Sequence, residues 1–566
     1  MSVSPRTSPG PPGHVQGSPT TAGPGDRPRI RHNDYSPLVP PPLGTWSPEL
    51  RVSVVIPAHG GQHRLDLTLA ALAAQTYPAG LMEVIVVDDG SEPPLRLPGT
   101  RPENTRLVPA APGGWGIAHA LNTGARLAEG EIIQRLDADM VTSREHIEAL
   151  MRWHHLTDYI VTIGAKVFVE EPALTSVQVR EAVGAGNLDS LFDMAAAIPS
   201  STEATIRRLD GLRASKNPYH VCTGPTVSLR RALFHEAGGL DPAVLRGEDT
   251  EFAYRLAMRG VVFVPDMEAR AVHLGIPAQR VDTEATVRVV APYLAHRIPL
   301  RRDLRKERGR RWLIPYAEVV LDVRRAEPGG RGHSGPDGKE DIDSAARTHA
   351  EPKVRAAVGA ALGGSLPDVV VTLLGPWSAL PEGRHRVLDD PGFEARLIRE
   401  QFRHDDAVRF AEEAAADPDP VPFRYTGPVD VPLARRSLEL MIKNLNDTRA
   451  GLLLVEFPDG RAARLERTDA TNRARLLAGL GEDLDDVIEQ THGVRRCPSS
   501  DFWPPEKPKP QPPPVATAPA AGEATAPSPD RPSPATTPPD RPGPSPTSPG
   551  APEKLVKRLR TALRGR

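Results

Sequence analysis

Two pairs of aspartates directly follow segments that are expected to be buried strands. Asp88 and Asp89 directly follow the apolar run VIVV, and Asp137 and Asp139 form an Asp-x-Asp motif after the run at 131–136. Carboxylates grouped in this way can hold a divalent cation or accept hydrogen bonds from a ligand. Either pair alone is more typical of a helix cap or an Asx turn. Because two such pairs follow consecutive strands, we interpret them as parts of one binding site.

A third acidic pair and a histidine follow later in the chain. Glu248 and Asp249 lie at the N-terminus of a helix expected over 251–259, where the helix dipole favours an ionised carboxylate. On their own they fit a charge cap at the start of that helix. His273 comes after a strand expected at 261–264, and a histidine on its own is more often structural than a ligand. Combined with carboxylates, an imidazole suits Mn²⁺ or Mg²⁺ rather than a metal that prefers thiolates.

Alternating strands and helices are expected to position these residues. The β-branched runs at 51–57 and 82–87 predict strands with a helix between them, and 117–127 predicts a helix followed by a strand at 131–136. Alternation of this kind predicts an α/β fold, with a mostly parallel sheet that binds ligands at the carboxyl ends of its strands. Since the aspartates follow those ends, we expect them to lie close together.

The distribution of proline divides the chain of 566 residues. Its 63 prolines are concentrated near the two ends, in stretches with too few apolar side chains to offset the entropy of ordering. Strands at 368–374 and 451–457 and helices at 433–445 and 468–478 predict a second, smaller α/β domain. The expected divisions are a disordered segment at 1–49, a first domain at 50–325, a linker at 326–350, the second domain at 351–500, a disordered Pro-rich linker at 501–552 and a basic tail at 553–566.

Charge and cysteine content exclude several classes of protein. A formal net charge of −2 gives no argument for nucleic acid, and two cysteines are too few for a disulfide framework. No apolar run approaches the length of a membrane span, so we expect a cytoplasmic protein. The tail at 553–566 has the spacing of a short basic amphipathic helix. It fits a solvated tail best, and contact with an anionic surface at the inner face of the membrane is the alternative.

Several segments together resemble the family 2 glycosyltransferases of the GT-A fold. They are VSVVIPAHG at 52–60, VVDDGS at 86–91, ALNTG at 120–124, LDADM at 136–140, TGPTVSLRR at 223–231, and GGLD at 238–241 with GEDTEFAYRL ending at Leu256. The resemblance implies a Rossmann-like nucleotide-binding sheet. It also implies an inverting, metal-dependent hexosyltransferase-type enzyme that moves a sugar from a nucleotide diphosphate, in particular UDP, to an acceptor hydroxyl. Cell-surface glycans, glycolipids or secondary metabolites of bacterial type are the implied products.

The resemblance also assigns roles to individual residues. Asp249 corresponds to the catalytic base, Asp139 and His273 to metal ligands for Mn²⁺ or Mg²⁺, and Asp137 to a contact with ribose or metal. The implied donor-binding residues are Pro57, Asp88, Asp89, Asn122 and Asp137, and the implied supports of the acceptor side are Thr223, Gly224, Glu248 and Arg255. The sugar, the acceptor and the oligomeric state do not follow from the sequence.

The chain also departs from the family pattern. Ala58-His59-Gly60 replaces the Tyr-Asn-Glu of many relatives, and Arg308-Gly309-Arg310-Arg311-Trp312 replaces the Gln-x-x-Arg-Trp of processive synthases. Together with the absence of a membrane helix, this favours transfer of single sugars. The arginines from 301 to 311 fit either a site for phosphate or an anionic lipid-linked acceptor, or a solvated basic helix.

Two other functions fit parts of the sequence. A metal-dependent nucleotidyltransferase uses similar carboxylates, but the glycines at 60–61 are a poor phosphate loop. A noncatalytic sugar-nucleotide-binding scaffold would use the Pro-rich tails to recruit partners. In the second domain, Asn444 and the stretch ending at Asp459 faintly echo Asn122 and the strand before Asp137, which suggests a decayed copy of the first domain. We otherwise expect that domain to bind acceptor or to serve assembly.

Overall fold

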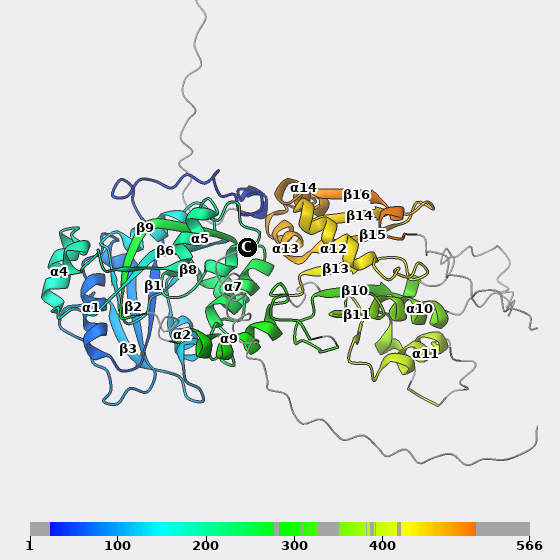
Figure 1. Ribbon diagram of the computed structural model, residues 1–566, viewed down its shortest axis with the longest axis horizontal. Helices are drawn as coiled ribbons and strands as arrows, with labels where there is room; N and C mark the ends of the chain where they lie inside the picture. The colour runs from blue at the N-terminus through cyan, green and yellow to red at the C-terminus, as the bar shows by residue number, and fades with distance from the viewer. Residues whose placement is uncertain are drawn as a thin grey trace, which may run out of the picture. The chain divides into compact units, whose positions relative to one another are not determined.

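Two mixed β-sheets, each covered by helices, organise the chain (Figure 1). The structure is a computed structural model. It describes residues 23–276, 282–307, 309–325, 350–380, 382–384, 386, 390, 392–415 and 420–504. Both sheets belong to one compact unit that ends at Trp503.

The first sheet has nine strands among the described residues. Its order is β3-β2-β1-β4-β8-β6-β9-β5, with β7 beside β6. The strands are β1 Val52–Ala58, β2 Met82–Asp88, β3 Thr105–Pro109, β4 Ile132–Arg135, β5 Met140–Thr142, β6 Ile160–Val169, β7 Ile198–Pro199, β8 Val227–Arg230 and β9 Val262–Leu274. Strands β3, β2, β1, β4, β6 and β9 point the same way, and β5, β7 and β8 run opposite. The expected mostly parallel α/β fold is therefore confirmed for this region.

Helices cover both faces of this sheet because its central strands are apolar on both sides. They are α1 Gln62–Leu72, α2 Ile117–Leu127, α3 His146–His154, α4 Ser176–Gly184, α5 Ser201–Arg208, α6 Arg231–Glu236, α7 Glu248–Met258 and α9 Thr283–Arg297. Val54 and Ile56 of β1 pack with α1 and α3. Val55 points to the other face and packs with α2 and α7. The helix predicted at 117–127 has the bounds of α2, so the strand and helix predictions around the acidic pairs are confirmed.

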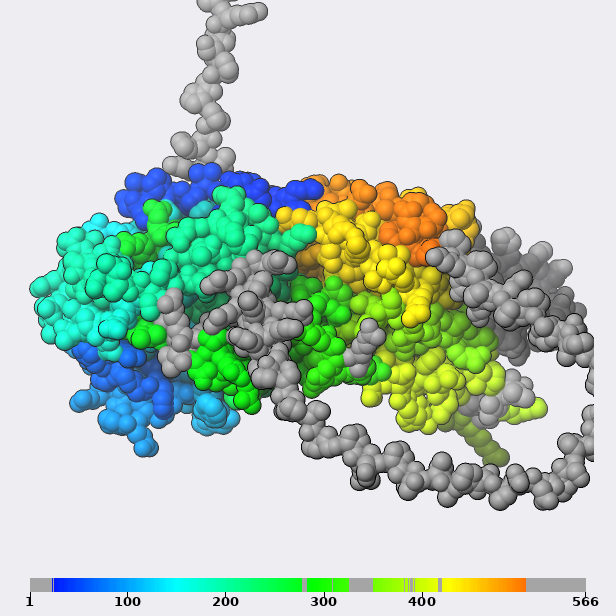
Figure 2. All heavy atoms as spheres, viewed as in Figure 1, coloured from blue at the N-terminus to red at the C-terminus, as the bar shows by residue number. Residues whose placement is uncertain are grey.

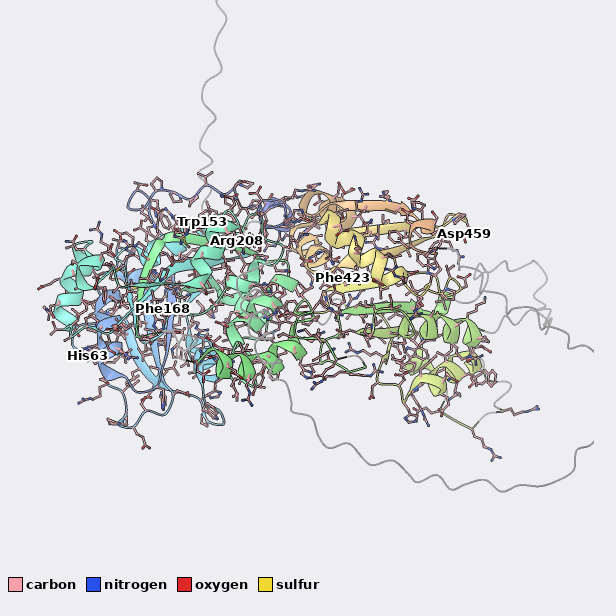
Figure 3. The ribbon with its side chains drawn as sticks, viewed as in Figure 1. His63, Trp153, Phe168, Arg208, Phe423 and Asp459 are labelled. Carbon is pink, nitrogen blue, oxygen red and sulfur yellow. The ribbon has the colours of Figure 1, made fainter. Side chains whose placement is uncertain are left out.

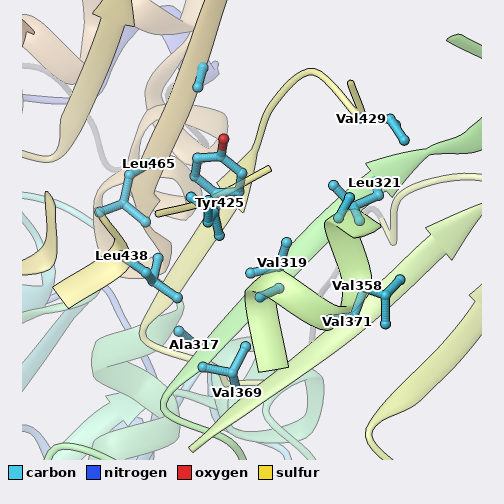
Figure 4. Close-up of a cluster of buried hydrophobic side chains, with 14 of the residues drawn as sticks. Ala317, Val319, Leu321, Val358, Val369, Val371, Tyr425, Val429, Leu438 and Leu465 are labelled. Atoms are coloured by element: carbon cyan, nitrogen blue, oxygen red, sulfur yellow. The ribbon is translucent and has the colours of Figure 1, made fainter. Parts of the chain in front are cut away.

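The second sheet has seven strands among the described residues, in the order β12-β11-β10-β13-β15-β14-β16. They are β10 Ala317–Asp322, β11 Val369–Leu374, β12 Val408–Ala411, β13 Phe423–Thr426, β14 Leu452–Glu456, β15 Ala462–Arg467 and β16 Val494–Pro498. Its helices are α10 Ala350–Leu362, α11 Phe393–Phe402, α12 Ser437–Thr448, α13 Thr468–Leu477 and α14 Leu484–Thr491. Val319, Val371 and Tyr425, from the three adjacent strands β10, β11 and β13, belong to its core (Figure 4).

The expected boundary of the first domain at residue 325 is wrong. Strand β10, at 317–322, is central in the second sheet, where it pairs in parallel with both β11 and β13. Its buried run of valines and leucine needs strands on both sides, and only the second sheet provides them. The second domain therefore begins before the expected linker. Residues 326–349, which make up nearly all of that linker, lie outside the described residues.

The prediction that residues 1–49 are disordered is also wrong for the part that the structure describes. We call residues 27–38 the strap. Ile30 in the strap is fully buried, and the side chain of Asn33 bonds to both the N–H and the carbonyl oxygen of Phe263 in β9. The space-filling view shows this segment, in blue, meeting the orange residues of the second domain (Figure 2). Amino-acid composition does not predict that the strap is ordered, because the residues that hold it lie more than 100 positions away in the sequence.

Three further expectations concern the remaining parts of the chain. Three predicted segments lie outside the described residues: 1–22, nearly all of the Pro-rich linker at 501–552, and the basic tail at 553–566. Among the residues that the structure describes, no helix is both long and apolar enough to span a membrane. The arginines from 301 to 311 form no helix in their described part. Arg302 and Arg305 both pair with Asp368, at 3.1 and 2.8 Å, so much of that positive charge is already neutralised.

Candidate functional site

Three of the predicted residues meet at the carboxyl end of β4. Asp137 and Asp139 follow that strand, and His273 arrives from β9, whose antiparallel pairing with β5 sets it opposite Met140. One ligand atom from each of the three lies within 4.8 Å of the other two. The fold thus brings a histidine and an Asp-x-Asp motif together across more than 130 residues of sequence.

The carboxylate of Asp139 fits a cation ligand. Its Oδ1 is buried and has no hydrogen-bond partner among the described residues, although Nε2 of His273 lies 3.5 Å away. Burial raises the pKa of Asp139, and the neighbouring Asp137 adds to this, while His273 and Arg64 oppose it. A buried carboxylate oxygen without a donor is costly, and a divalent cation would satisfy it. Two carboxylates and an imidazole form a donor set suited to Mn²⁺ or Mg²⁺.

The ring of His273 is held in one orientation. Nδ1 lies 3.2 Å from the carbonyl oxygen of Leu274, which can only accept a hydrogen bond. Nε2, the other ring nitrogen, lies 3.5 Å from Oδ1 of Asp139. The ring of Phe168 on β6 packs against the imidazole with a centroid separation of 4.9 Å (Figure 3). A ring held in one orientation by a hydrogen bond at its other nitrogen is typical of a histidine that binds metal.

Arg135, which the sequence analysis did not single out, connects this cluster to helix α7. Its guanidinium is almost fully buried, with Nε 3.3 Å from Asp137 and a terminal nitrogen 3.5 Å from Glu248. Burial lowers the pKa of Arg135, but Asp137, Glu248 and Asp249 together raise it above its usual value. The signal in the sequence was an arginine inside an apolar strand, because a charge buried there must be paired.

Glu248 and Asp249 open α7, as predicted. Burial raises the pKa of Glu248, and the adjacent Asp249 raises it further, against the effect of Arg135. The carboxylate of Asp249 is half-buried and accepts a 2.6 Å hydrogen bond from the N–H of Thr250. A carboxylate at this position can act as a proton acceptor.

Lys166 of β6 is a second buried cation at the site that the sequence analysis missed. Its ammonium donates a 2.9 Å hydrogen bond to the carbonyl oxygen of Thr223. Burial lowers the pKa of Lys166, while Asp249 and Asp137 act to raise it. Gly224 follows with φ of +81° in the left-handed region. The predicted Thr223 and Gly224 therefore form a turn that is fixed to the same side of the site as Asp249.

Asp88 and Asp89, the first acidic pair, make different contacts. Asp88 accepts hydrogen bonds from the N–H groups of Ser91 and Leu95, at 2.8 and 3.0 Å. Although burial acts to raise the pKa of Asp88, these bonds hold it below its usual value. Asp89 accepts one bond, from the N–H of Gly116 at 2.6 Å. Asp88 thus shapes the loop that presents Asp89. The predicted Pro57 is buried in β1, in register with Val87 of β2.

Asn122 and Arg255 hold one loop in place. Both polar groups of the Asn122 amide bond to the backbone of Leu240, at 2.8 and 2.9 Å. Arg255 pairs with Glu251 at 2.7 Å and donates to the carbonyl oxygens of Ala237 and Gly239. These contacts are with the protein itself, so the structure shows both side chains as supports of the segment that leads to Glu248 and Asp249.

An exposed tryptophan lies beside Asp89. Trp115 stands in a glycine-rich loop between β3 and α2, and 72% of its surface is exposed. The next residue, Gly116, is the one whose N–H binds Asp89. The loop therefore sets an indole next to the carboxylate that the resemblance assigns to the nucleobase.

Comparison with known proteins matches this part of the chain. Residues 53–238 match the model of Glycosyl transferase family 2. A chondroitin synthase of Escherichia coli is 24% identical over 265 residues, which cover 44% of this chain and 38% of the relative. Validoxylamine A glucosyltransferase of Streptomyces hygroscopicus subsp. limoneus is 26% identical over 252 residues, covering 43% of this chain and 55% of the relative. The match thus spans only part of each curated relative.

Solved structures are similar at lower levels. One is a mannosyltransferase from Pyrobaculum calidifontis in complex with GDP-Man and Mn²⁺, with a TM-score of 0.31 and 20% identity over 48% of this chain and 68% of that one. The matched segment 53–238 contains both aspartate pairs, and the sheet around them has the expected GT-A class of fold. The family match and the curated relatives together show that residues 53–238 and their surroundings are similar to family 2 glycosyltransferases.

Proposed function

We propose that this protein is an inverting, metal-dependent glycosyltransferase that moves a sugar from a nucleotide diphosphate, with UDP as the expected nucleotide, to an acceptor hydroxyl. The observation that carries the proposal is the cluster of Asp137, Asp139 and His273, with the unpartnered buried oxygen of Asp139, inside the segment that matches the family. Asp137, Asp139 and His273 would hold the cation, which would neutralise charge developing on the departing diphosphate.

Asp249 is the proposed base. A single displacement at the anomeric carbon forms a bond from the acceptor oxygen, breaks the bond to the diphosphate oxygen and inverts configuration. The attacking hydroxyl must lose its proton as this happens, and a carboxylate at the N-terminus of α7 can accept it. The buried cations Arg135 and Lys166 lie among these carboxylates, and Arg135 pairs with Asp137 and Glu248.

Asp89 is the proposed contact for the nucleobase. Only one hydrogen bond to its carboxylate is formed within the described residues, from Gly116, so it keeps acceptor capacity for a ring N–H. Asp88 supports it from within the loop rather than by direct contact. Single-sugar transfer remains our expectation, because Arg308 stands where processive synthases have Gln.

The first experiment is a thermal-shift screen with uridine, guanosine and thymidine diphosphates and their sugars, each with Mn²⁺, with Mg²⁺ and with chelator. A ligand that binds only the native state stabilises it, by about 2.7 kcal/mol at 100 times its Kd. We expect a metal-dependent shift with one base, followed by release of that nucleoside diphosphate when an acceptor is added. A shift with none of these ligands would contradict the proposal and favour a scaffold.

A further inference from the structure

The guanidinium of Arg473 in α13 joins three parts of the chain. It is buried and donates hydrogen bonds to four backbone carbonyl oxygens. Two of these belong to Gly260 and Val261, directly after α7, and two belong to Ile30 and His32 in the strap. An arginine has five N–H donors, so this side chain is used almost completely by backbone groups.

The end of α7 is seated directly on α13. A Cβ atom built on Gly260 would lie 2.5 Å from the backbone nitrogen of Arg473 and 2.6 Å from its Cα. No side chain fits there, and the φ of Gly260, +83°, is also one that glycine favours. The backbone of the second domain therefore limits where α7 can end.

Two more side chains hold the last turns of α7. The amide of Asn472 donates a 2.8 Å hydrogen bond to the carbonyl oxygen of Met258. Tyr254 is fully buried in the middle of α7, and its hydroxyl donates to the carbonyl oxygen of Pro420, which comes before β13. The second domain thus contacts α7 and the residues just after it at three successive positions, Tyr254, Met258 and Gly260.

The strap fastens both domains from outside. Arg27 pairs with Asp158 of the first domain at 2.7 Å, and Arg29 pairs with Glu482 of the second domain at 2.6 Å. One apolar cluster is shared by the strap and the two sheets, and it includes Ile30, Tyr35, Val262, Val264, Leu452, Leu454, Ala470 and Ala474. Such a shared core makes the seat of α7 stiff.

We propose that the second α/β domain acts as a brace for α7, and that Arg473 is the residue that positions it. This inference rests on the proposed function, because the opposite end of α7 carries Glu248 and Asp249. An eleven-residue helix is about 16 Å long and moves as a rigid rod, so a shift at Gly260 is carried to Asp249. The proposed nucleobase and metal residues Asp89, Asp137 and Asp139 follow β2 and β4. His273 is the next-to-last residue of β9, at the end opposite to Val262.

If the second domain braces α7, loss of Arg473 should change kcat but not the KM for donor. Arg473→Met removes four hydrogen bonds, two of them to the residues directly after α7, and should lower kcat at least about tenfold, since misplacing a catalytic group by about 1 Å can cost 10²-fold. The KM for donor, and the metal-dependent thermal shift with nucleotide, should stay within about twofold of wild type. Arg473→Lys keeps the charge and part of the bonding, so its kcat should be intermediate.

Arg464→Met is the matched control. Arg464 is also in the second domain and is paired with Asp485 and Glu466 at 2.7 and 2.9 Å, but these contacts lie within that domain. This variant should lose stability without a change in kcat. If Arg464→Met lowers kcat as much as Arg473→Met, or if the latter lowers donor affinity in parallel with kcat, the brace is wrong. Asn472→Ala removes one bond only, and it serves if Arg473→Met does not fold.

Hydrogen exchange separates this inference from the proposed function. In Arg473→Met, the hydrogen-bonded amides of α7, from Glu251 to Met258, should exchange faster than in Arg464→Met, while those of α1 and α3 should not change. If wild type transfers no sugar, the proposed function fails, and the exchange data still decide whether the second domain braces α7. Unchanged exchange in α7 would overturn the brace whatever the activity.

Discussion

The two sheets of this protein share an order of strands but not a chemistry. In the first, β3-β2-β1-β4 run in parallel and β8 joins antiparallel to β4. In the second, β12-β11-β10-β13 run in parallel and β15 joins antiparallel to β13. Each central strand, β1 or β10, is also joined to its neighbour by a helix. Five strands of the two sheets therefore correspond.

What differs is the residues after the strands. In the first sheet Asp88 and Asp89 end β2, and Asp137 follows β4. At the corresponding places the second sheet has Gly375-Pro376 after β11 and Gly427-Pro428 after β13. These residues turn the chain but offer no carboxylate or imidazole. The same sheet can thus be a binding platform or a structural part, and the strand ends decide which.

The similarity expected between Asp459 and Asp137 does not agree with the strand order of the two sheets. Asp459, labelled in Figure 3, lies in the turn between β14 and β15. The strand that corresponds to β4 in the order of the second sheet is β13. Asp459 is exposed and paired with Arg461 at 2.7 Å. The correspondence between the domains lies in the sheet order, and the local motif is unrelated to it.

The largest expected effect tests the acidic end of the first sheet. Asp249→Asn keeps the size of the side chain and an oxygen that can accept from the N–H of Thr250 but removes the proposed base, so we expect transfer to fall by about 10²- to 10⁴-fold. The affinity for the donor, measured by the metal-dependent thermal shift, should be close to that of the wild type. Full activity of this variant would mean that another group accepts the proton.

The next effect tests the metal. Asp139→Ala removes the buried oxygen that lacks a donor, so Mn²⁺ should no longer raise the melting temperature in the presence of nucleotide, and chelator should have no further effect. Wild type should lose activity with chelator and recover it with Mn²⁺. Equal metal-dependent donor affinity in both proteins would disprove the assignment of Asp139.

A smaller effect concerns the strap between the sheets. Burial, and then Arg449 and Arg31, lower the pKa of His32 to about 4. Its ring meets His492 edge-on at 5.3 Å. Between about pH 6.5 and 4 the unfolded chain binds a proton at this position that the folded chain does not, so stability falls as the pH falls through this window.

His32→Asn should make that loss of stability shallower, because it removes one of the groups. Asparagine also tolerates the φ of +52° at this position better than most residues. Urea denaturation at pH 7.5, 6 and 5 measures the slope. An unchanged slope would show that the strap carries no proton-linked stability.

The smallest effect belongs to the second sheet. Asp459→Asn should change neither transfer nor donor binding, and stability by less than about 1 kcal/mol, since exposed ion pairs contribute little. Measured beside Asp139→Ala under the same conditions, it is the matched comparison for an acidic residue after a strand. A loss of activity would mean that the second sheet takes part in the reaction.

Local pattern predicted the elements well and the long-range pairs poorly. Helix α2 and strands β1, β2, β4 and β11 follow from periodicity, since each signal lies within a few residues. Asp137 and Asp139 were recognised together from their spacing, whereas joining His273 to them relied on a family resemblance.

Arg135, Lys166 and the strap could not be predicted in the same way. Arg135 and Lys166 are buried cations whose partners are set by the fold, and in the strap Asn33 meets Phe263 across 230 residues. Their sequence signals, single polar residues in apolar or Pro-rich surroundings, carry no information about which partner they meet. The wrong boundary at 325 has the same origin, because β10 shows its membership only through β11 and β13.

The loop that presents Asp89 also gives the protein an optical reporter. Of its six tryptophans, all within the described residues, Trp115 alone is exposed. An indole in water fluoresces at longer wavelength than one covered by a ligand or by protein. A nucleotide that stacks on or near Trp115 should therefore shift or quench the emission. Ligand binding beside Asp89 could then be followed in real time, in the unlabelled protein, with Trp115→Phe as the silent reference.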